Sequence, residues 1–182
     1  MQQTIDPTIQ LARAYNFAAS RHANQRRKGA DAEPYINHLI EVADFVAEAS
    51  NGDVAVVIAA VLHDAVEDAG VTLVEIEAEF GADVAGPVAE VTDDKMLPKQ
   101  VRKNLQIEHA PHASLRTKLI KMADKISNLR SLTDSPPVDW DAERIVEYCR
   151  WAKLVVDGCR GAHIGLSHKF DEAHKRAAAN QL

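Results

Sequence analysis

The sequence predicts an all-α protein, and three kinds of observation along its 182 residues support this fold class. Apolar residues recur at the i, i+3, i+4 spacing of one helix face, as in Leu39, Val42, Ala43 and Val46. The alternation of apolar and polar residues that marks a half-buried strand does not recur. Residues that favour helix ends separate the apolar runs. A chain of this length fits one domain, so we expect a single domain over residues 1–182.

Residues typical of helix ends bound the first three expected helices. Asp6 comes before Pro7, a residue favoured in the first helical turn, and the helix that follows is expected to run to about residue 23. The second helix covers residues 36–49 and closes at an Asn-Gly pair. Asp53 can cap a third helix over residues 54–66. This third segment is apolar nearly all round, which predicts a central, buried position.

Two shorter helices and one basic helix are expected in the middle of the chain. Thr72 and Glu75 have the spacing of a capping box, in which each side chain bonds the other's backbone amide, and the helix they start runs to Phe80. Residues 81–94 are expected to hold another short helix. Pro98 starts a helix rich in basic residues.

Three longer helices complete the expected fold. Ser114 caps a helix that runs to about Leu132, with a stripe of apolar residues along one side. After a proline-containing loop, Asp139 is expected to cap a helix through Val156. A last helix of modest amphipathicity takes the chain to its end.

Charge and composition exclude some classes of function. The formal net charge is −6, whereas general binding to a nucleic-acid polymer needs clustered Lys and Arg. The N-terminal "MQQTIDPTIQ" lacks the pattern of a secretory signal, and the longest apolar run, residues 54–62, is too short to span a bilayer. Cys149 and Cys159 lack the C-x-x-C spacing of zinc or redox sites. We therefore expect a cytoplasmic protein with no membrane partner.

Four polar residues stand at the end of the apolar segment 54–66 and near it: His63, Asp64, Glu67 and Asp68. Burying a carboxylate costs several kcal/mol unless a cation or hydrogen-bond donors compensate for the lost water. On a continuous helix His63 and Glu67 would share one side, as would Asp64 and Asp68. A metal held by His63 and Asp64, with Glu67 and Asp68 orienting a water or carrying its proton, would explain the placement. A salt-bridged helix end explains it equally well.

Two more positions bear on the metal hypothesis. His38 starts the apolar stripe of the second helix, where a lone histidine is usually an ordinary core residue. Asp124 and Asn128 are four residues apart and off the apolar stripe, which by itself indicates a solvated face. Taken together, His38, His63, Asp64 and Asp124 give two imidazoles and two carboxylates from three helices. That set is a plausible incomplete shell for a catalytic transition metal.

A basic tripeptide lies in the loop before His38. Arg26, Arg27 and Lys28 would place positive charge beside the predicted metal, where an anionic substrate would need it. A solvated basic loop is the alternative interpretation.

The order H…HD…D, formed by His38, His63-Asp64 and Asp124, resembles the HD-domain phosphohydrolase superfamily, whose fold is a helical bundle around a metal. The segments "RRKGADAEPYINH", "VLHDAVEDAGVT", "EVTDDKMLPK" and "KMADKISNLRSL" resemble the hydrolase domain of RelA/SpoT-type enzymes, especially the stand-alone metazoan SpoT homolog group. The likeness covers about the whole chain. It implies a manganese enzyme that removes the 3′-pyrophosphate of the alarmone (p)ppGpp, giving GDP or GTP and pyrophosphate.

The resemblance also implies roles for individual residues. The implied Mn²⁺ ligands are His38, His63, Asp64 and Asp124, and the implied acid/base pair is Glu67 and Asp68. It implies that Arg27 packs against the guanine base, that Lys28 lies near the nucleotide and that Asn128 contacts the nucleoside. The implied contacts to phosphate or sugar, each also compatible with ordinary surface, are Lys95, Lys99, Arg144 and Tyr148.

The sequence departs from the common pattern at two places and leaves two rival functions open. Leu39 stands where a proline often follows the first metal histidine, and Gly29-Ala30 stand where the long enzymes often carry serine. The same metal set would serve a hydrolase of another nucleotide, such as NADPH or a deoxynucleotide. A non-catalytic alarmone-binding module is the other rival, and the presence of Glu67 and Asp68 counts against it. Because the chain ends at Leu182, before the synthetase and regulatory domains of the long enzymes, alarmone synthesis is not expected.

Overall fold

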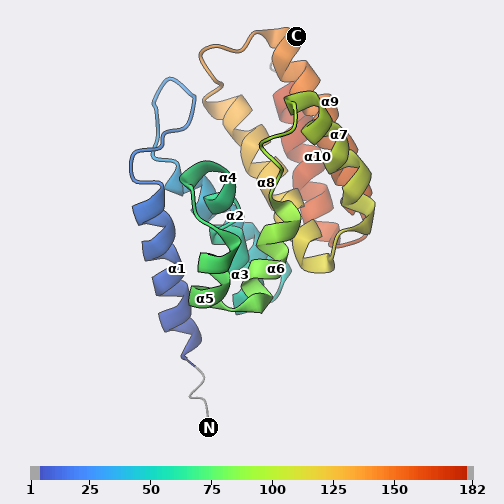
Figure 1. Ribbon diagram of the computed structural model, residues 1–182. Coiled ribbons are helices and arrows are strands. Elements are labelled where there is room, and N and C mark those ends of the chain that lie inside the picture. Colours follow the sequence, from blue (N-terminus) through green and yellow to red (C-terminus); the bar gives the residue numbers. More distant parts are fainter. Residues whose placement is uncertain (1–4, 180–182) are drawn as a thin grey trace.

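The computed structural model describes residues 5–179, and within this range the chain forms helices joined by short loops (Figure 1), which confirms the all-α prediction. In chain order the elements are α1 (Pro7–Arg21), α2 (Ile36–Ala49), α3 (Val54–Val61), α4 (Ala65–Ala69), α5 (Leu73–Phe80), α6 (Ala82–Val91), α7 (Lys99–His109), the 3₁₀ turn η1 (Ala110–His112), α8 (Leu115–Asp134), α9 (Ala142–Cys159) and α10 (Ile164–Ala179). None of the described helices is both long and apolar enough to cross a membrane.

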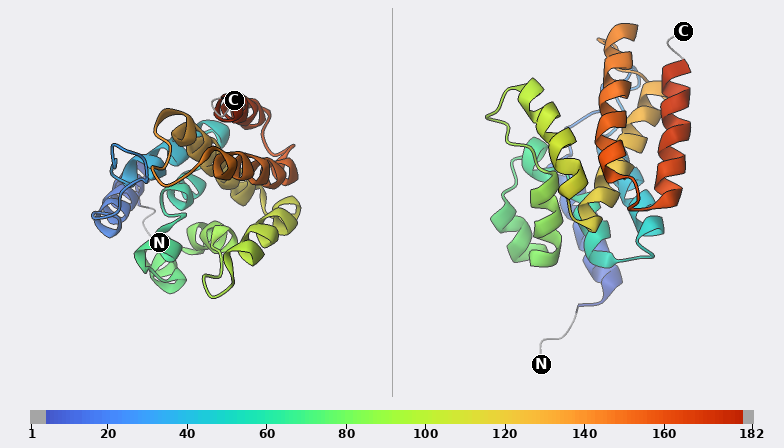
Figure 2. Two further views of the ribbon diagram at one scale, coloured as in Figure 1. Left: turned by 90° about the horizontal axis from the view of Figure 1, so that it is seen from above. Right: turned by 90° about the vertical axis from the view of Figure 1, so that its right-hand side faces the viewer.

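The long helix α8 lies at the centre of the packing. It contacts α2, α3, α6, α9 and α10, and the two views of Figure 2 show the other helices arranged around it. The largest fully buried side chains include Leu39 of α2, Ile58 of α3, Met122 of α8 and Phe170 of α10. In α3 every residue from 56 to 61 is buried, as its apolar composition predicts. The apolar core therefore surrounds the segments that carry the predicted metal ligands.

Side chains cap the helices at the places that the sequence indicates. The Asp6 carboxylate accepts a hydrogen bond from the Thr8 amide at 2.8 Å, and Asp53 accepts one from the Ala55 amide at 3.1 Å. Thr72 and Glu75 form the complete capping box at the start of α5. These bonds satisfy amides that have no partner inside the helix and stabilise each helix start by about 1 kcal/mol.

The predicted continuous helix over residues 54–66 is wrong, because the chain breaks it at the functional dipeptide. Helix α3 ends at Val61, and α4 begins only at Ala65. The Leu62 amide is shared between the carbonyls of Ile58 and Ala59, which tightens the last turn, and the Ala65 amide bonds the Leu62 carbonyl at 2.9 Å. His63 and Asp64 therefore lie in a turn between two helices.

Four other helix ends also differ from the prediction, among them that of α8, which ends at Asp134, two residues beyond the predicted Leu132. Asp141, two residues after the predicted Asp139, caps α9 by accepting a hydrogen bond from the Arg144 amide at 2.8 Å. This helix continues to Cys159, beyond the predicted Val156, because apolar residues continue on its buried side. Helix α1 ends at Arg21, slightly before the predicted residue 23. The last helix is described to Ala179, and its predicted final residues 180–182 lie outside the described range.

Two loops meet at one end of the helical bundle, the upper end in Figure 1: residues 22–35, before α2, and residues 135–141, before α9. Gly29 pairs with Pro137 in an isolated bridge, and the Val138 amide bonds the Lys28 carbonyl at 3.2 Å. A Cβ atom at position 29 would lie 2.1 Å from the Ser135 hydroxyl oxygen, so the close contact requires glycine.

Candidate metal centre and nucleotide cavities

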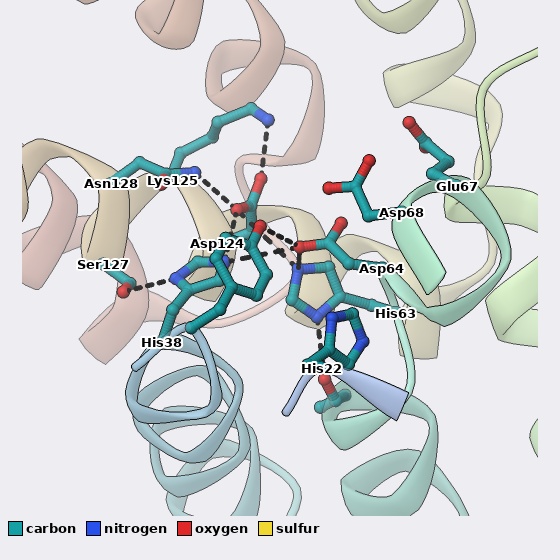
Figure 3. A network of polar contacts seen from close by, with 12 residues as sticks. His22, His38, His63, Asp64, Glu67, Asp68, Asp124, Lys125, Ser127 and Asn128 are labelled. Atoms are coloured by element: carbon teal, nitrogen blue, oxygen red, sulfur yellow. Dashed lines mark hydrogen bonds and ion pairs between the residues drawn. The ribbon is translucent and has the colours of Figure 1, made fainter. Parts of the chain in front are cut away.

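The structure brings the four predicted metal ligands together from α2, the α3–α4 turn and α8 (Figure 3). His38 Nε2 lies 3.4 Å from Asp124 Oδ1 and 3.7 Å from Asp64 Oδ2. His63 Nε2 lies 3.2 Å from Asp64 Oδ2 and 3.9 Å from Asp124 Oδ1. Both imidazoles are buried and both carboxylates are mostly buried. We call these residues the His/Asp cluster.

Each imidazole of the cluster is oriented through its second nitrogen. His63 Nδ1 lies 2.8 Å from the Ala60 carbonyl, which only accepts hydrogen bonds, so this nitrogen carries a proton. His38 Nδ1 lies 2.8 Å from the Ser127 hydroxyl, which itself donates to Glu41 Oε2 at 2.6 Å. Since the Ser127 proton goes to Glu41, its oxygen accepts from His38. Both rings therefore turn Nε2 toward the carboxylates, as metal-binding histidines do.

Hydrogen-bond donors also fix the two carboxylates. The Tyr35 hydroxyl donates to Asp64 Oδ2 at 2.6 Å. On α8, Asn128 Nδ2 donates to Asp124 Oδ1 and Lys125 Nζ donates to Asp124 Oδ2, each at 2.6 Å. Such partners hold ligand oxygens in place before an ion arrives.

The electrostatics of the cluster keep both carboxylates charged. Burial alone would raise the pKa of Asp64, but His63 and His38 hold it below its ordinary value. Burial would also raise the pKa of Asp124, and Lys125 together with the histidines lowers it. Burial lowers the pKa of His38, whereas at His63 the carboxylates outweigh burial and raise the pKa to about 9. The two ionised carboxylates thus favour a positive charge at this site: a proton on His63 at neutral pH, or a divalent cation that displaces this proton when it binds.

The donor atoms fit a divalent transition metal. His38, His63 and Asp124 each offer one ligand atom, and these atoms all lie within 4.8 Å of one another. Asp64 stands at the edge of this group, with Oδ2 close to both imidazoles. Within residues 5–179, His63 Nε2 is buried and forms no hydrogen bond, which is the condition expected of a nitrogen that a cation would satisfy. Mixed imidazole and carboxylate ligands suit Mn²⁺, Fe²⁺, Co²⁺ or Zn²⁺.

Glu67 and Asp68 lie on α4, to one side of the His/Asp cluster (Figure 3). The helix is interrupted before α4, so His63 and Glu67 do not share one continuous helix, but the Asp68 amide bonds the Asp64 carbonyl at 2.9 Å and keeps these two residues one helical turn apart, as predicted. Glu67 Oε1 accepts the Asp93 backbone N–H at 2.7 Å, and Lys95 Nζ lies 2.7 Å from Asp68 Oδ1. Burial raises the pKa of Glu67, although the Asp93 amide opposes the shift.

Two cavities meet beside the cluster. The first, about 280 Å³ and called here the outer cavity, is lined by the basic loop, by Asp68 and by Trp140. The second, about 220 Å³ and called the inner cavity, is lined by His63, Asp64, Asp124 and Glu67, and also by Lys121 and Lys125. Three residues line both cavities: Tyr35, Asn128 and Tyr148. The shared lining makes the two cavities adjacent compartments of one site.

The predicted substrate-binding residues fall into two groups. Arg27 and Lys28 line the outer cavity, and Arg27 Nη1 donates to Asn128 Oδ1 at 3.2 Å. Asn128 and Tyr148 line both cavities. The remaining three, Lys95, Lys99 and Arg144, line neither of these cavities. Lys95 bonds Asp68, and Lys99 is exposed at the start of α7. The Arg144 guanidinium lies 4.6 Å from the centre of the Trp140 ring.

Several residues of the site escaped the sequence analysis. Tyr35, Ser127 and Trp140 carry no sequence signal that marks them as functional. Lys121 and Lys125 do carry one, because they are four residues apart, lie on either side of Asp124 and are buried among the apolar residues of α8. Two lysines on one side of a buried helix need an anionic neighbour, so their spacing indicates an acidic or phosphate-binding cavity.

Comparisons with known proteins agree with this geometry. Residues 14–148 match the HD domain family, so this chain is an HD-domain protein. Over 162 residues, covering 88% of this chain and 90% of the relative, it is 51% identical to the guanosine-3′,5′-bis(diphosphate) 3′-pyrophosphohydrolase MESH1 of Xenopus tropicalis. It is 48% identical over 168 residues to the Homo sapiens protein of the same name, covering 92% of this chain and 94% of that protein. The chain belongs to this MESH1 family.

A solved structure gives the same result at the level of the fold. It is that of a metazoan ortholog of SpoT described as hydrolysing ppGpp and as playing a role in starvation responses. The two chains share 46% sequence identity and superpose with a TM-score of 0.90, covering 94% of this chain and 97% of the other. The expected HD-domain fold is therefore confirmed.

Proposed function

We propose that this protein hydrolyses the 3′-pyrophosphate of (p)ppGpp and releases pyrophosphate with GDP or GTP. The observation that carries the proposal is the His/Asp cluster, whose imidazole Nε2 atoms and carboxylates converge where the basic outer cavity meets the inner cavity, which holds two lysines. The family relatives named as ppGpp 3′-pyrophosphohydrolases support the choice of substrate.

His38, His63, Asp64 and Asp124 would hold the metal, which we propose is Mn²⁺. When bound there, Mn²⁺ supplies a water of lowered pKa and positive charge beside the phosphoryl oxygens. The Glu41–Ser127 pair keeps the His38 ring in place, and the Ala60 carbonyl does the same for His63.

Glu67 is the proposed general base. The Asp93 amide orients its carboxylate, and its raised pKa places it closer to neutrality, where proton uptake is most effective. The water oxygen forms a bond to the first phosphorus of the 3′-diphosphate while the bond from that phosphorus to O3′ breaks. Glu67 takes the water proton, and this proton is proposed to pass by way of Asp68, which Lys95 holds in place, to O3′, which leaves as the 3′-hydroxyl of GDP or GTP.

The outer cavity would hold the nucleoside. Arg27 and Lys28 supply positive charge, and the rings of Tyr35, Trp140 and Tyr148 supply flat surfaces against which a purine can stack. Asn128, between the two cavities, would contact the nucleoside. Lys95, Lys99 and Arg144 would contact phosphate or sugar from outside the cavity linings.

The proposed partner is a small nucleotide, and the proposed location is the cytoplasm. Cys149 and Cys159 are both buried and unpaired, which suits a reducing compartment.

The test is to add ppGpp and Mn²⁺ to the purified protein and to measure released pyrophosphate. We expect release from the wild type and from Glu79→Gln, an exposed control on α5, and strongly reduced release from Asp64→Ala and Glu67→Ala. Unchanged release from both site variants would exclude this site. A parallel panel with NADPH and deoxynucleotides decides between substrates, and ppGpp binding without turnover would indicate a non-catalytic module.

A further inference from the structure

One buried cation in the inner cavity has no role in the mechanism above. Lys121, on α8, is 6% exposed and lines the inner cavity together with His63, Asp64 and Asp124. Among residues 5–179, no side chain or backbone group forms a hydrogen bond or ion pair with its ammonium group. Lys121 Nζ is not among the fully buried unpartnered atoms, so the apolar stem of this lysine is buried while its charged end faces the inner cavity, where an anion would meet it.

The neighbouring lysine shows the contrast. Lys125, one helical turn further along α8, is equally buried, but its ammonium bonds Asp124 at 2.6 Å and lies 4.5 Å from the centre of the Trp151 ring. Lys121 has no such partner. Burial and the charge of Lys125 lower the pKa of Lys121, although Asp93 and Asp124 act in the opposite direction from a distance. An anion entering the inner cavity would provide the missing counter-charge.

The inner cavity has room for such an anion. Its volume is about 220 Å³, several times the ~30 Å³ that one water molecule occupies in the liquid. Residues of the His/Asp cluster line the same cavity, so a ligand bound at the metal could extend to Lys121 within this one cavity. The outer cavity, with Arg27 and Lys28, remains free for the rest of the nucleotide.

We propose that Lys121 binds the terminal phosphate of the 3′-diphosphate and thereby selects a pyrophosphate ester over a monophosphate ester. This inference rests on the proposed function. In the reaction the terminal phosphate changes no bond, because the bond that breaks joins O3′ to the first phosphorus. Lys121 therefore acts by binding and positioning the departing pyrophosphate.

The first experiment uses inorganic pyrophosphate and inorganic phosphate as probes. Their dissociation constants are measured by calorimetry on the Mn²⁺-loaded wild type, on Lys121→Gln and on the control Lys175→Gln, which removes an exposed lysine on α10. We expect Lys121→Gln to weaken pyrophosphate binding by about ten- to a hundredfold, the range for a hydrogen bond to a charged group, and phosphate binding by less than about threefold. Equal effects on both probes, or none on either, would overturn the proposal.

The second experiment compares ppGpp with guanosine 5′-diphosphate 3′-monophosphate, which lacks only the terminal phosphate. Lys121→Gln should lower kcat/KM for ppGpp by about ten- to a hundredfold and leave turnover of the monophosphate nearly unchanged, with Lys121→Arg restoring part of the difference. Loss on both substrates alike would contradict a role at the terminal phosphate. If the wild type releases no pyrophosphate from ppGpp, the proposed function fails, and the probe binding still decides the role of Lys121. Thermal unfolding of each variant shows whether a loss of activity arises from misfolding. If Lys121→Gln does not fold, Lys121→Met replaces it as the uncharged variant.

Discussion

The His/Asp cluster and the outer cavity adjoin one another and share three lining residues, yet the chain builds them in different ways. The cluster residues come from helices α2 and α8 and from the α3–α4 turn. Each is held by a hydrogen-bond partner, such as the Ala60 carbonyl for His63 or the Tyr35 hydroxyl for Asp64. The outer cavity is bordered by the loops 22–35 and 135–141, and its basic side chains are largely or partly exposed. The part proposed to perform chemistry is held by hydrogen bonds between helices, and the part proposed to recognise the nucleotide is built from loops.

The largest expected effect is at the cluster itself. Asp124→Asn removes a charged ligand, so we expect Mn²⁺ to be lost on dialysis and pyrophosphate release to fall by more than about a thousandfold. Metal content by elemental analysis and steady-state rates provide the two measurements. The matched change Glu79→Gln, on an exposed turn of α5, should alter neither. A variant that loses its metal and keeps its rate would separate the cluster from catalysis.

Glu67→Gln should have the next largest effect and should act on rate alone. Removing a general base lowers kcat by about a hundred- to ten-thousandfold, and the amide retains the shape that receives the Asp93 N–H. Metal content should stay at the wild-type level, because Glu67 is not expected to be a ligand. A parallel fall in bound metal and in kcat would place Glu67 among the ligands instead.

The two imidazoles of the cluster allow a finer test of rigidity. A backbone carbonyl orients His63, but the removable Ser127 hydroxyl orients His38. Ser127→Ala should weaken Mn²⁺ binding by about ten- to a hundredfold, as loss of an outer hydrogen-bond partner usually does. Titration against a competing chelator measures this directly. The control is Ser20→Ala, which removes a hydroxyl that bonds the carbonyl one turn earlier on α1 and should leave the Mn²⁺ affinity unchanged. If Ser127→Ala binds Mn²⁺ as tightly as the wild type, packing alone orients His38.

The smallest expected effect is at the rim of the outer cavity. The Arg144 guanidinium lies over Trp140, an interaction of about 0.5–1 kcal/mol at an exposed position. Arg144→Ala should therefore raise KM for ppGpp about two- to fivefold and leave kcat unchanged. Arg150→Ala, an exposed arginine on the same helix, is the control. A large loss of kcat at unchanged KM would assign Arg144 to the chemical step.

The same comparison explains how much could be predicted from the sequence. His63 and Asp64 stand out as polar residues after an apolar segment, whereas His38 and Asp124 gained weight only as members of the same set. Capping residues correctly marked the starts of α1, α3, α5 and α8. The break between α3 and α4 carries no glycine or proline, and an apolar run reports burial without reporting continuity. Lys121 and Lys125 were identifiable from their spacing but were missed.

The outer cavity was harder to predict because it depends on contacts between distant segments. Trp140 enters it through the pairing of residues 29 and 137, which no local pattern records. For Lys99 the sequence offered only a resemblance, and the structure places it exposed and outside both cavities. Its role stays a prediction, as does the extent of a single domain over residues 1–182.

The absence of a side chain at Gly29 affects the width of the outer cavity, which Gly29 and Trp140 both line. Because even one carbon atom there would collide with Ser135, the two loops can approach this closely only while position 29 stays bare. Any larger residue would force the 135–141 loop outward, carrying Trp140 with it. The width of the cavity proposed to hold the nucleoside thus depends on a residue that has no side chain of its own.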